Sequence, residues 1–410
     1  MRWRYRIMRQ LKWLLMIAGA LSCTAESTAP IELEVSQAAL GLVSEASAYA
    51  WVQASGRAPL QYQKSSLGTR VVAARSAVGV YDVTFAGFRS DGNVQVVAYG
   101  SNGRCKLASW FFEVLPGTTA FLTQVRAQVR CFGVGAARGP QDNAFVISYV
   151  DDTRISDPGP PSSPRADRLR AGFLSVDVAA LAPLAPRITR NWSSVGGRFE
   201  VTRTPRQVGR YHVVALGAAW TGDAQGALAV TAVGADDDSY CKIASFGNLA
   251  GGPPLREGLE VPPRDRDFDV RCFDGAGVAA EQGFSLRYAY WANFGSAGTG
   301  AYATKSDFSA RPTPAQQVVG GSALTIDREG VGSYRVYVFD LSPIHSAAFA
   351  GALGRSTATE PAIGNEHCNV ESWIGNFFGV TELTLRCYTP TGTAADTPYH
   401  VSYLGPEASP

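Results

Sequence analysis

The chain has 410 residues, of which 46% are hydrophobic and 18% charged, and its formal net charge is +2 at pH 7. This composition excludes an intrinsically disordered chain, and the length suffices for two to four domains. The first 22 residues hold five basic groups and no acid, so the remaining chain carries about −3 and offers nucleic acid no long-range attraction. Nucleic acid is therefore not an expected partner.

Residues 1–22 predict a signal peptide. Basic residues precede a short apolar run, Leu14 to Leu21, which is too short for a permanent transmembrane helix. Cys23 follows Ala-Leu-Ser, which resembles the lipobox of bacterial lipoproteins, where the cysteine receives the lipid. We therefore expect an exported lipoprotein, anchored in the outer membrane or at the cell surface through Cys23, with a tether over residues 23–45. The alternative is ordinary signal-peptidase cleavage, which would leave Cys23 as a spare thiol and the protein secreted.

The rest of the chain contains the same series of strand-like phrases three times. Each copy has an Arg-ended strand, a Gly-x-Tyr strand, two Cys-bearing strands and an aromatic closing strand, with the period-two alternation of half-buried strands. The first Cys-bearing phrase, for example, reads RCKLASW at 104–110, YCKIASF at 240–246 and HCNVESW at 367–373.

These repeats predict an all-β fold class, with three tandem antiparallel β-sandwich modules and one internal disulfide in each module. The modules are expected at residues 46–150, 168–288 and 289–405. A Pro/Ser-rich linker over residues 151–167 separates the first two.

Seven cysteines occur, and the six beyond Cys23 could pair in 15 ways. One early and one late cysteine fall in each copy, which predicts the pairs Cys105–Cys131, Cys241–Cys272 and Cys368–Cys387. A bridge that closes a loop of roughly 20–30 residues stabilises the fold by about 3 kcal/mol and forms in an oxidising compartment.

Strand alternation predicts that one arginine and two aromatic side chains share the sheet face opposite the cysteines in each copy. Two interpretations stay open. The arginine packs between rings as a cation–π contact that serves folding, or the three side chains form a ligand platform for a sugar ring or a protein surface. The predicted sets are Trp110, Arg130 and Phe132; Phe246, Arg271 and Phe273; Trp373, Arg386 and Tyr388.

Catalytic and metal-binding motifs are not evident in the sequence. The four histidines occupy no shared position in the repeat, and the spacings of known nucleophile elbows, phosphate loops and zinc sites do not occur. We therefore expect no enzymatic activity and no cofactor. Asp236, Asp237 and Asp238 form an acidic loop that is a weak candidate for calcium, with a solvated turn as the alternative.

The order of these phrases resembles repeats in exported proteins of high-GC bacteria that have no assigned activity. The likeness covers nearly the whole chain beyond the signal segment, but the third copy has Asn369 in place of the lysine and Tyr388 in place of the phenylalanine. The resemblance implies an exported β-repeat protein and no catalytic residues.

We expect a non-enzymatic binding or adhesion protein that contacts a polysaccharide, another envelope polymer or a surface protein, and the membrane through its lipid. A structural envelope component without a specific ligand is the alternative. A hydrolase with its site in one module comes third.

Overall fold

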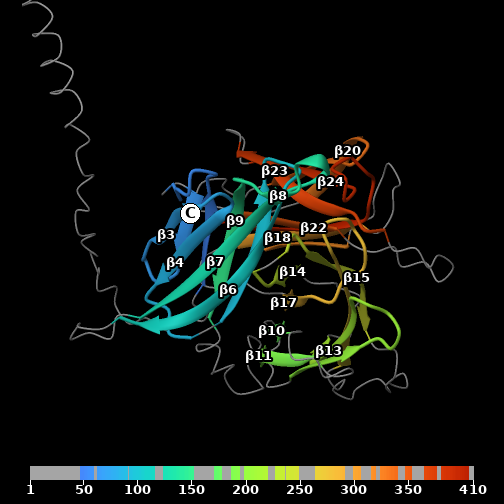
Figure 1. Cartoon of the computed structure of the whole chain (residues 1–410), viewed down its shortest axis with the longest axis horizontal. Coiled ribbons are helices and arrows are strands. Elements are labelled where there is room, and N and C mark those ends of the chain that lie inside the picture. The colour runs from blue at the N-terminus through green and yellow to red at the C-terminus, as the bar shows by residue number, and fades with distance from the viewer. Residues whose placement is uncertain are drawn as a thin grey trace, which may run out of the picture. The chain divides into compact units, whose positions relative to one another are not determined.

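A computed structural model describes residues 47–59, 62–90, 92–115, 123–151, 170–177, 186–193, 198–219, 227–235, 237–248, 264–290, 299–305, 315–319, 324–339, 347–352, 364–375 and 380–405. The predicted signal peptide, Cys23, the tether and the linker beyond Asp151 lie outside these residues. Nearly all described elements are strands (Figure 1), which confirms the all-β fold class. No helix in the described part of the chain is long and apolar enough to cross a membrane.

The strands of residues 47–151, here called repeat 1, form two four-stranded antiparallel groups. The first group has the order β2 (Gln63–Ser65), β1 (Ser47–Val52), β9 (Ala144–Val150), β5 (Asn93–Tyr99). The second has the order β3 (Val71–Ala77), β4 (Val80–Ala86), β7 (Thr123–Gly133), β6 (Arg104–Val114), and the short β8 (Gly139–Pro140) pairs with β7.

Residues 170–290 and 299–405, here called repeats 2 and 3, place their strands in the same two orders. The first groups are β11 (Arg187–Ser193), β10 (Arg170–Asp177), β17 (Gly283–Tyr290), β14 (Ala227–Val233), and β19 (Ala315–Val319), β18 (Thr299–Lys305), β25 (Tyr399–Gly405), β22 (Ala347–Ala352). The second groups are β12 (Phe199–Arg203), β13 (Arg210–Ala219), β16 (Arg264–Phe273), β15 (Tyr240–Asn248), and β20 (Leu324–Gly330), β21 (Ser333–Phe339), β24 (Val380–Tyr388), β23 (His367–Gly375).

The two groups of each repeat enclose a hydrophobic core. In β4, the alternation predicted from the sequence places Tyr81, Val83 and Phe85 inside, where all three are fully buried. They pack against Phe145 and Ile147 of β9 in the other group. Burial of each such side chain stabilises the fold by about 1.5–3 kcal/mol. The alternation therefore selects the face of each strand that closes the sandwich.

All three predicted disulfides are present. Each links directly paired residues on two neighbouring strands: Cys105–Cys131, Cys241–Cys272 and Cys368–Cys387. The Cα atoms lie 4.1, 4.0 and 4.0 Å apart. The repeats are therefore stapled at one equivalent position, as the cysteine spacing predicted.

The sheets do not stop at the ends of the repeats. Strand β14 of repeat 2 joins β6 of repeat 1 through a parallel bridge between Val233 and Leu107. Strand β5 of repeat 1 joins β23 of repeat 3 in the same way, between Tyr99 and Val370. Figure 1 labels three of these four strands, β6, β14 and β23. The boundaries of three separate sandwich modules stay a prediction, because the described strands continue from one repeat into another.

Candidate functional site

A cluster of one acid, one arginine and one tyrosine recurs in every repeat, and we call it the acid corner. In repeat 1, Asp142 Oδ1 accepts hydrogen bonds from Arg75 Nε at 2.7 Å and from the backbone N–H of Gly79 at 2.8 Å. Tyr81 Oη lies 3.4 Å from the same oxygen. These bonds attach the hairpin between β3 and β4 to the segment before β9.

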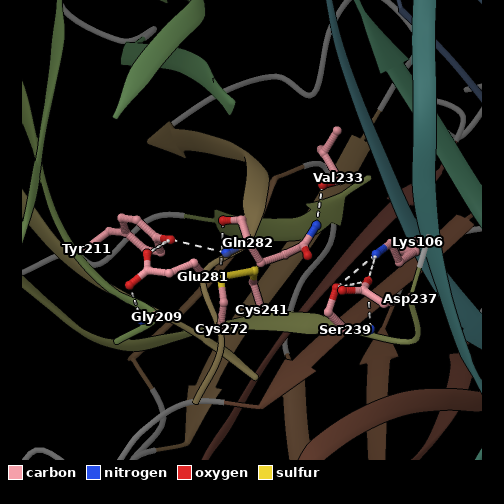
Figure 2. The surroundings of a disulfide bond; sticks show 10 residues. All are labelled: Lys106, Gly209, Tyr211, Val233, Asp237, Ser239, Cys241, Cys272, Glu281 and Gln282. Atoms are coloured by element: carbon pink, nitrogen blue, oxygen red, sulfur yellow. Dashed lines mark hydrogen bonds and ion pairs between the residues drawn. A yellow bond between two sulfur atoms is a disulfide. The ribbon is translucent and has the colours of Figure 1, made fainter. Parts of the chain in front are cut away.

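Repeats 2 and 3 build the same corner from their own residues. In repeat 2, Glu281 accepts from Tyr211 at 2.7 Å and from the Gly209 N–H at 3.1 Å, as Figure 2 shows. Arg203 lies 2.5 Å from this carboxylate. Repeat 3 uses Arg328, Gly332, Tyr334 and Asp396, with Oδ atoms of Asp396 at 2.6, 2.9 and 3.0 Å from the three donors.

The acid corner shifts the ionisation of its members. Hydrogen bonding to Arg75 holds the pKa of Asp142 below its usual value, and Arg328 does the same for the pKa of Asp396. Burial raises the pKa of the Tyr81 hydroxyl to about 12. The tyrosines therefore keep their protons and act as hydrogen-bond donors, as in the tyrosine corners of other sandwiches.

The glycine of each corner is required by the backbone. Gly79 has φ of +66°, and a Cβ at this position would lie 2.5 Å from the carbonyl oxygen of Cys131. The equivalent glycines, Gly209 and Gly332, would meet the carbonyl oxygens of Cys272 and Cys387 at the same distance. The recurrent glycine before the tyrosine thus allows the hairpin to approach the disulfide strand.

The predicted aromatic and arginine sets do not share one face. A β-bulge at Ala108 shifts the register of β6 against β7, so that Trp110 enters the core of repeat 1. Equivalent bulges at Ala244 and Glu371 direct Phe246 and Trp373 to the cores of their repeats. The prediction of a common face is therefore wrong for these three aromatics, because each bulge inverts the alternation.

The remaining members of the sets also lie away from a common open surface. Phe132 and Phe273 are buried, and Tyr388 is half-buried. Their arginines differ in partner: Arg130 donates to the Ala235 carbonyl at 2.6 Å, Arg271 lies 3.8 Å from Asp269, and Arg386 lies 2.6 Å from Glu371. The described geometry does not bring these residues together on one surface. Ligand binding by them stays a prediction.

A cation–π contact does cover Trp110, but the arginine comes from another repeat. The Arg190 guanidinium lies 4.2 Å from the indole centroid, and its Nη2 donates to the Trp110 carbonyl at 3.1 Å. The packing interpretation of the aromatics thus applies to Trp110 with a different partner, and the contact joins repeat 2 to repeat 1.

The acidic loop of repeat 2 contacts cations of repeat 1. Asp237 binds Lys106, while Asp238 binds Arg138 at 3.2 Å and the Gly275 N–H at 3.1 Å. Asp236 lies outside the described residues. Within the part of the chain that the structure describes, no group of three or more histidine, cysteine or carboxylate side chains is placed to hold a metal.

The residue after the first cysteine of each repeat, here called the junction residue, contacts another repeat: repeat 1 contacts repeat 2, repeat 2 contacts repeat 3, and repeat 3 contacts repeat 1. Lys106 Nζ lies 2.5 Å from Asp237 Oδ1 and 2.8 Å from Ser239 Oγ, and Figure 2 shows this cluster beside the Cys241–Cys272 bridge. Lys242 Nζ lies 3.5 Å from Glu366 Oε2. Asn369 Nδ2 donates to the Ser101 and Gly103 carbonyls at 3.0 and 2.7 Å.

These three junctions use equivalent positions. The partners stand two or four residues before the first cysteine of the receiving repeat. The three junction residues are 2%, 2% and 5% exposed. Burial lowers the pKa of Lys242 to about 8. Burial alone would raise the pKa of Asp237, but hydrogen bonds from Lys106 and Ser239 hold it below its usual value. In each junction a buried polar side chain therefore meets its own matched partner, and the partner Asp237 is itself 51% exposed.

The residues just before the first cysteines, Arg104, Tyr240 and His367, also meet. The Arg104 guanidinium lies 4.2 Å from the Tyr240 ring centroid, and the Tyr240 and His367 rings are 5.7 Å apart. Arg104 donates to the carbonyls of Gly275 and Pro390 at 3.0 and 3.2 Å, so it bridges repeats 2 and 3. All three repeats therefore contact one another at this point.

His367 is neutral at this position. Burial lowers the pKa of its ring to about 3. Nε2 lies 3.2 Å from the Asn102 carbonyl oxygen, which can only accept, so Nε2 carries the proton and Nδ1 is an acceptor. Nδ1 of His367 and Nε of Arg104 are buried and have no hydrogen-bond partner among the described residues.

The residues before and after the first cysteines line a cavity of about 70 Å³. Residues from the first strand groups complete the lining: the apolar Val96 to Ala98, Val230, Ala232 and Ala350, and the polar Thr231. The cavity therefore receives residues from every repeat, and it joins an apolar wall to a cationic one. Comparison with protein-family models, curated proteins and solved structures finds no match.

Ser239 and Lys106 are not arranged as a catalytic serine–lysine pair. Ser239 Oγ lies 2.8 Å from Lys106 Nζ, which is the pairing of a serine–lysine nucleophile. However, the Asp237 carboxylate at 2.5 Å favours the charged ammonium, which has no lone pair to act as a base, and Ser239 donates its own proton to Asp237. The cations and the orphan groups can instead hold a ligand.

The acids of the corners and the partners of the junctions were not predicted from the sequence. Asp142, Glu281 and Asp396 each stand three residues before the aromatic residue that opens the closing strand. Alignment of the three copies at that aromatic would have shown a recurrent acid. The junction partners follow no shared residue type, so only the folded arrangement shows them.

Proposed function

We propose that the chain is an exported, lipid-anchored β-repeat protein that binds a protein component of the cell envelope without catalysis. The observation that carries the proposal is a valine at the tip of the β3–β4 hairpin and of its two equivalents. Val78, Val208 and Val331 are 53%, 50% and 59% exposed. Single exposed apolar residues are ordinary, but valine is unfavourable in a tight turn, and its recurrence at the same exposed position in all three repeats favours a role in recognition.

The acid corners hold these tips in place. Each valine directly precedes the glycine whose N–H binds the corner carboxylate. A recognition residue on a fixed backbone loses less conformational freedom on binding than one on a loose loop. The corners thus present the three valines on a backbone that is already ordered.

A protein surface fits this arrangement better than a glycan does. Sugar recognition by stacking requires exposed aromatic faces, whereas Trp110, Trp373, Phe132 and Phe273 are at least 93% buried. Isolated valines instead suit small apolar pockets on a partner protein. The three disulfides are consistent with an oxidising extracellular environment, which supports export.

A structural envelope component without a specific ligand is the second candidate. The junctions favour it, because the buried side chains of Lys106, Lys242 and Asn369 use their polar groups to join one repeat to another, which serves cohesion rather than recognition.

Co-sedimentation with the envelope fraction of the native host separates the two candidates. The protein with Cys23→Ser, which removes the proposed anchor, is compared with a variant that also carries Val78→Ser, Val208→Ser and Val331→Ser. We expect the triple change to weaken binding by about tenfold or more, because three apolar contacts are lost. Protease treatment of the envelope should abolish binding altogether.

Val278→Ser is the matched control, since Val278 is 63% exposed but has no exposed valine equivalent in the other repeats. Thermal unfolding of each variant confirms that the fold is intact. Binding that survives both the triple change and the protease would contradict a protein-binding role, and failure to sediment at all would favour a structural role maintained by the lipid alone.

A further inference from the structure

We infer that the cavity between the three repeats is a binding site for a small phosphate-type oxyanion. The site is separate from the proposed surface function, because it is lined by buried residues, whereas the valine tips are exposed. Neither site requires the other, so each can be tested alone.

The lining of the cavity carries an excess of positive charge. Lys106, Lys242 and Arg104 all line the cavity and are 2%, 2% and 5% exposed. Asp237 and Glu366 pair with the two lysines. Arg104 hydrogen-bonds only carbonyl oxygens, and no carboxylate within the described residues forms an ion pair with it. The lining therefore contains one more cation than it has paired carboxylates.

Two more distant acids act on Arg104, but they do not remove this excess. Asp238 and Asp274 favour its charged form from beyond ion-pair distance, while Arg138 opposes it. Asp238 is itself paired with Arg138, and Asp274 accepts the backbone N–H groups of Ala276 and Val278. Burial of the charged guanidinium costs free energy, and a bound anion would offset that cost.

The lining also contains one hydrogen-bond donor and one acceptor that have no partner among the described residues. Arg104 Nε is a donor without a partner, and His367 Nδ1 is an acceptor without a partner. Buried polar groups are almost always satisfied by protein, water or ligand. An anion that satisfies both must accept one hydrogen bond and donate another. Hydrogen phosphate and phosphate monoesters at neutral pH or slightly below it do both, whereas sulfate and chloride only accept.

The volume of the cavity and its apolar wall suit a small anion. The volume of about 70 Å³ is several times the roughly 10–15 Å³ that one water needs, so the cavity can admit a small oxyanion. Val96 to Ala98, Val230 and Ala232 form an apolar wall, and charge interactions beside such a wall are stronger than in bulk solvent. Lys242, whose contacts with Glu366 are both 3.5 Å long, is available to turn toward the anion.

Calorimetric titration with inorganic phosphate, sulfate and chloride at constant ionic strength and pH 7 tests this assignment on the full chain. We expect one phosphate per chain, with sulfate at least about tenfold weaker because it leaves His367 Nδ1 unpaired. Phosphate should also raise the thermal unfolding temperature. Glycerol 3-phosphate distinguishes the source: binding shows that a terminal phosphate group enters, and exclusion shows that the free ion is the ligand.

Two variants identify the residues. Arg104→Gln should abolish phosphate binding, while the matched control Arg126→Gln, which removes a half-exposed arginine of repeat 1 that pairs with Glu113 away from the cavity, should leave it unchanged. His367→Phe should abolish the preference for phosphate over sulfate without changing the charge, and this readout survives even if Arg104→Gln does not fold. Equal binding of all three anions means an adventitious ion only, and no heat with any of them means a water-filled cavity. Either result would overturn the assignment.

Discussion

The acid corners and the junctions solve two different problems with polar residues. The three corners are chemically alike: an arginine, a glycine N–H and a tyrosine hydroxyl surround one carboxylate in each repeat. The three junctions are unlike: one uses a lysine with an aspartate, one a lysine with a glutamate, and one an asparagine with two backbone carbonyls.

This difference follows from what each cluster must specify. A corner closes its own repeat, so the same solution serves all copies. A junction must join one particular neighbour, and a buried ammonium placed against a repeat without the matching acid would be left uncompensated. The loop of repeat 1, Ser101 to Gly103, has no acid, and the residue that meets it is Asn369. The junctions therefore encode the order of the repeats.

The strongest way to break this pattern is to give the third junction the residue of the other two. Asn369→Lys places a buried ammonium against carbonyls alone, and we expect a loss of about 3–5 kcal/mol in the free energy of unfolding. Adding Ser101→Asp, which copies the position of Asp237, should recover about 1–3 kcal/mol. Denaturant unfolding of the single and double variants measures both.

The control for this pair is Ser101→Asp alone, which removes no contact of the Asn369 side chain with backbone carbonyls. If the double variant were as unstable as the sum of the single variants, the two positions would not be partners, and the matched-junction interpretation would be wrong.

Acid should weaken the contacts that two buried histidines make with other repeats before it weakens the corners. Burial lowers the pKa of His367 to about 3 and that of His400, which bonds the backbone of Leu228 in another repeat, to about 4. Their stabilising contribution is complete above the unfolded pKa of about 6.5 and is lost as pH falls toward these values. At pH 5 the loss in the free energy of unfolding amounts to about 2 kcal/mol for each histidine.

The corner carboxylates behave differently, because Arg75 and Arg328 lower the pKa of Asp142 and Asp396. Their contribution is present above about pH 4 and is lost only below it. Unfolding free energies measured from pH 7 to 3 should therefore fall in two stages, and His367→Gln should reduce the first stage alone. A single fall below pH 4 would contradict neutral, buried histidines.

Removal of a corner carboxylate should have a smaller and more uniform effect. Asp142→Asn, Glu281→Gln and Asp396→Asn each weaken charge-assisted hydrogen bonds, for an expected loss of about 1–3 kcal/mol. The three losses should agree within about 0.5 kcal/mol if the corners are equivalent. Unequal losses would show that one repeat depends on its corner in a way the others do not.

The smallest effect is expected at the hairpin tips. Val78→Ser, Val208→Ser and Val331→Ser should each change the unfolding free energy by less than about 0.5 kcal/mol, because the side chains are more than half or half exposed. Thermal denaturation checks this, and a larger loss would mean that these valines serve folding rather than recognition.

The features that depend on residues within one repeat, such as the core positions and the disulfides, were predicted correctly from the sequence. Strand alternation identified Tyr81, Val83 and Phe85 as core residues, and one early and one late cysteine per copy identified the three disulfides. The sides of Trp110 and Trp373 were predicted wrongly, because a bulge at Ala108 or Glu371 inverts the alternation without a glycine or proline to mark it.

The candidate cavity could not be predicted from the sequence. Its lining brings Arg104, Tyr240 and His367 together from positions more than a hundred residues apart, and the three are of different types. No local pattern links them, since their proximity results from how whole repeats join. The departure of Asn369 from the repeat was visible in the sequence, but its reason lies in the loop that it meets.

The disulfides are consecutive along the chain, whereas the third junction connects its first repeat to its last. For a protein that crosses a membrane as an unfolded chain, each cysteine pair is complete soon after its own repeat emerges. The contact of Asn369 with Ser101 must wait until most of the third repeat has followed. Oxidation can therefore proceed in step with translocation and hold each repeat in register, while the final assembly begins only once nearly the whole chain has arrived.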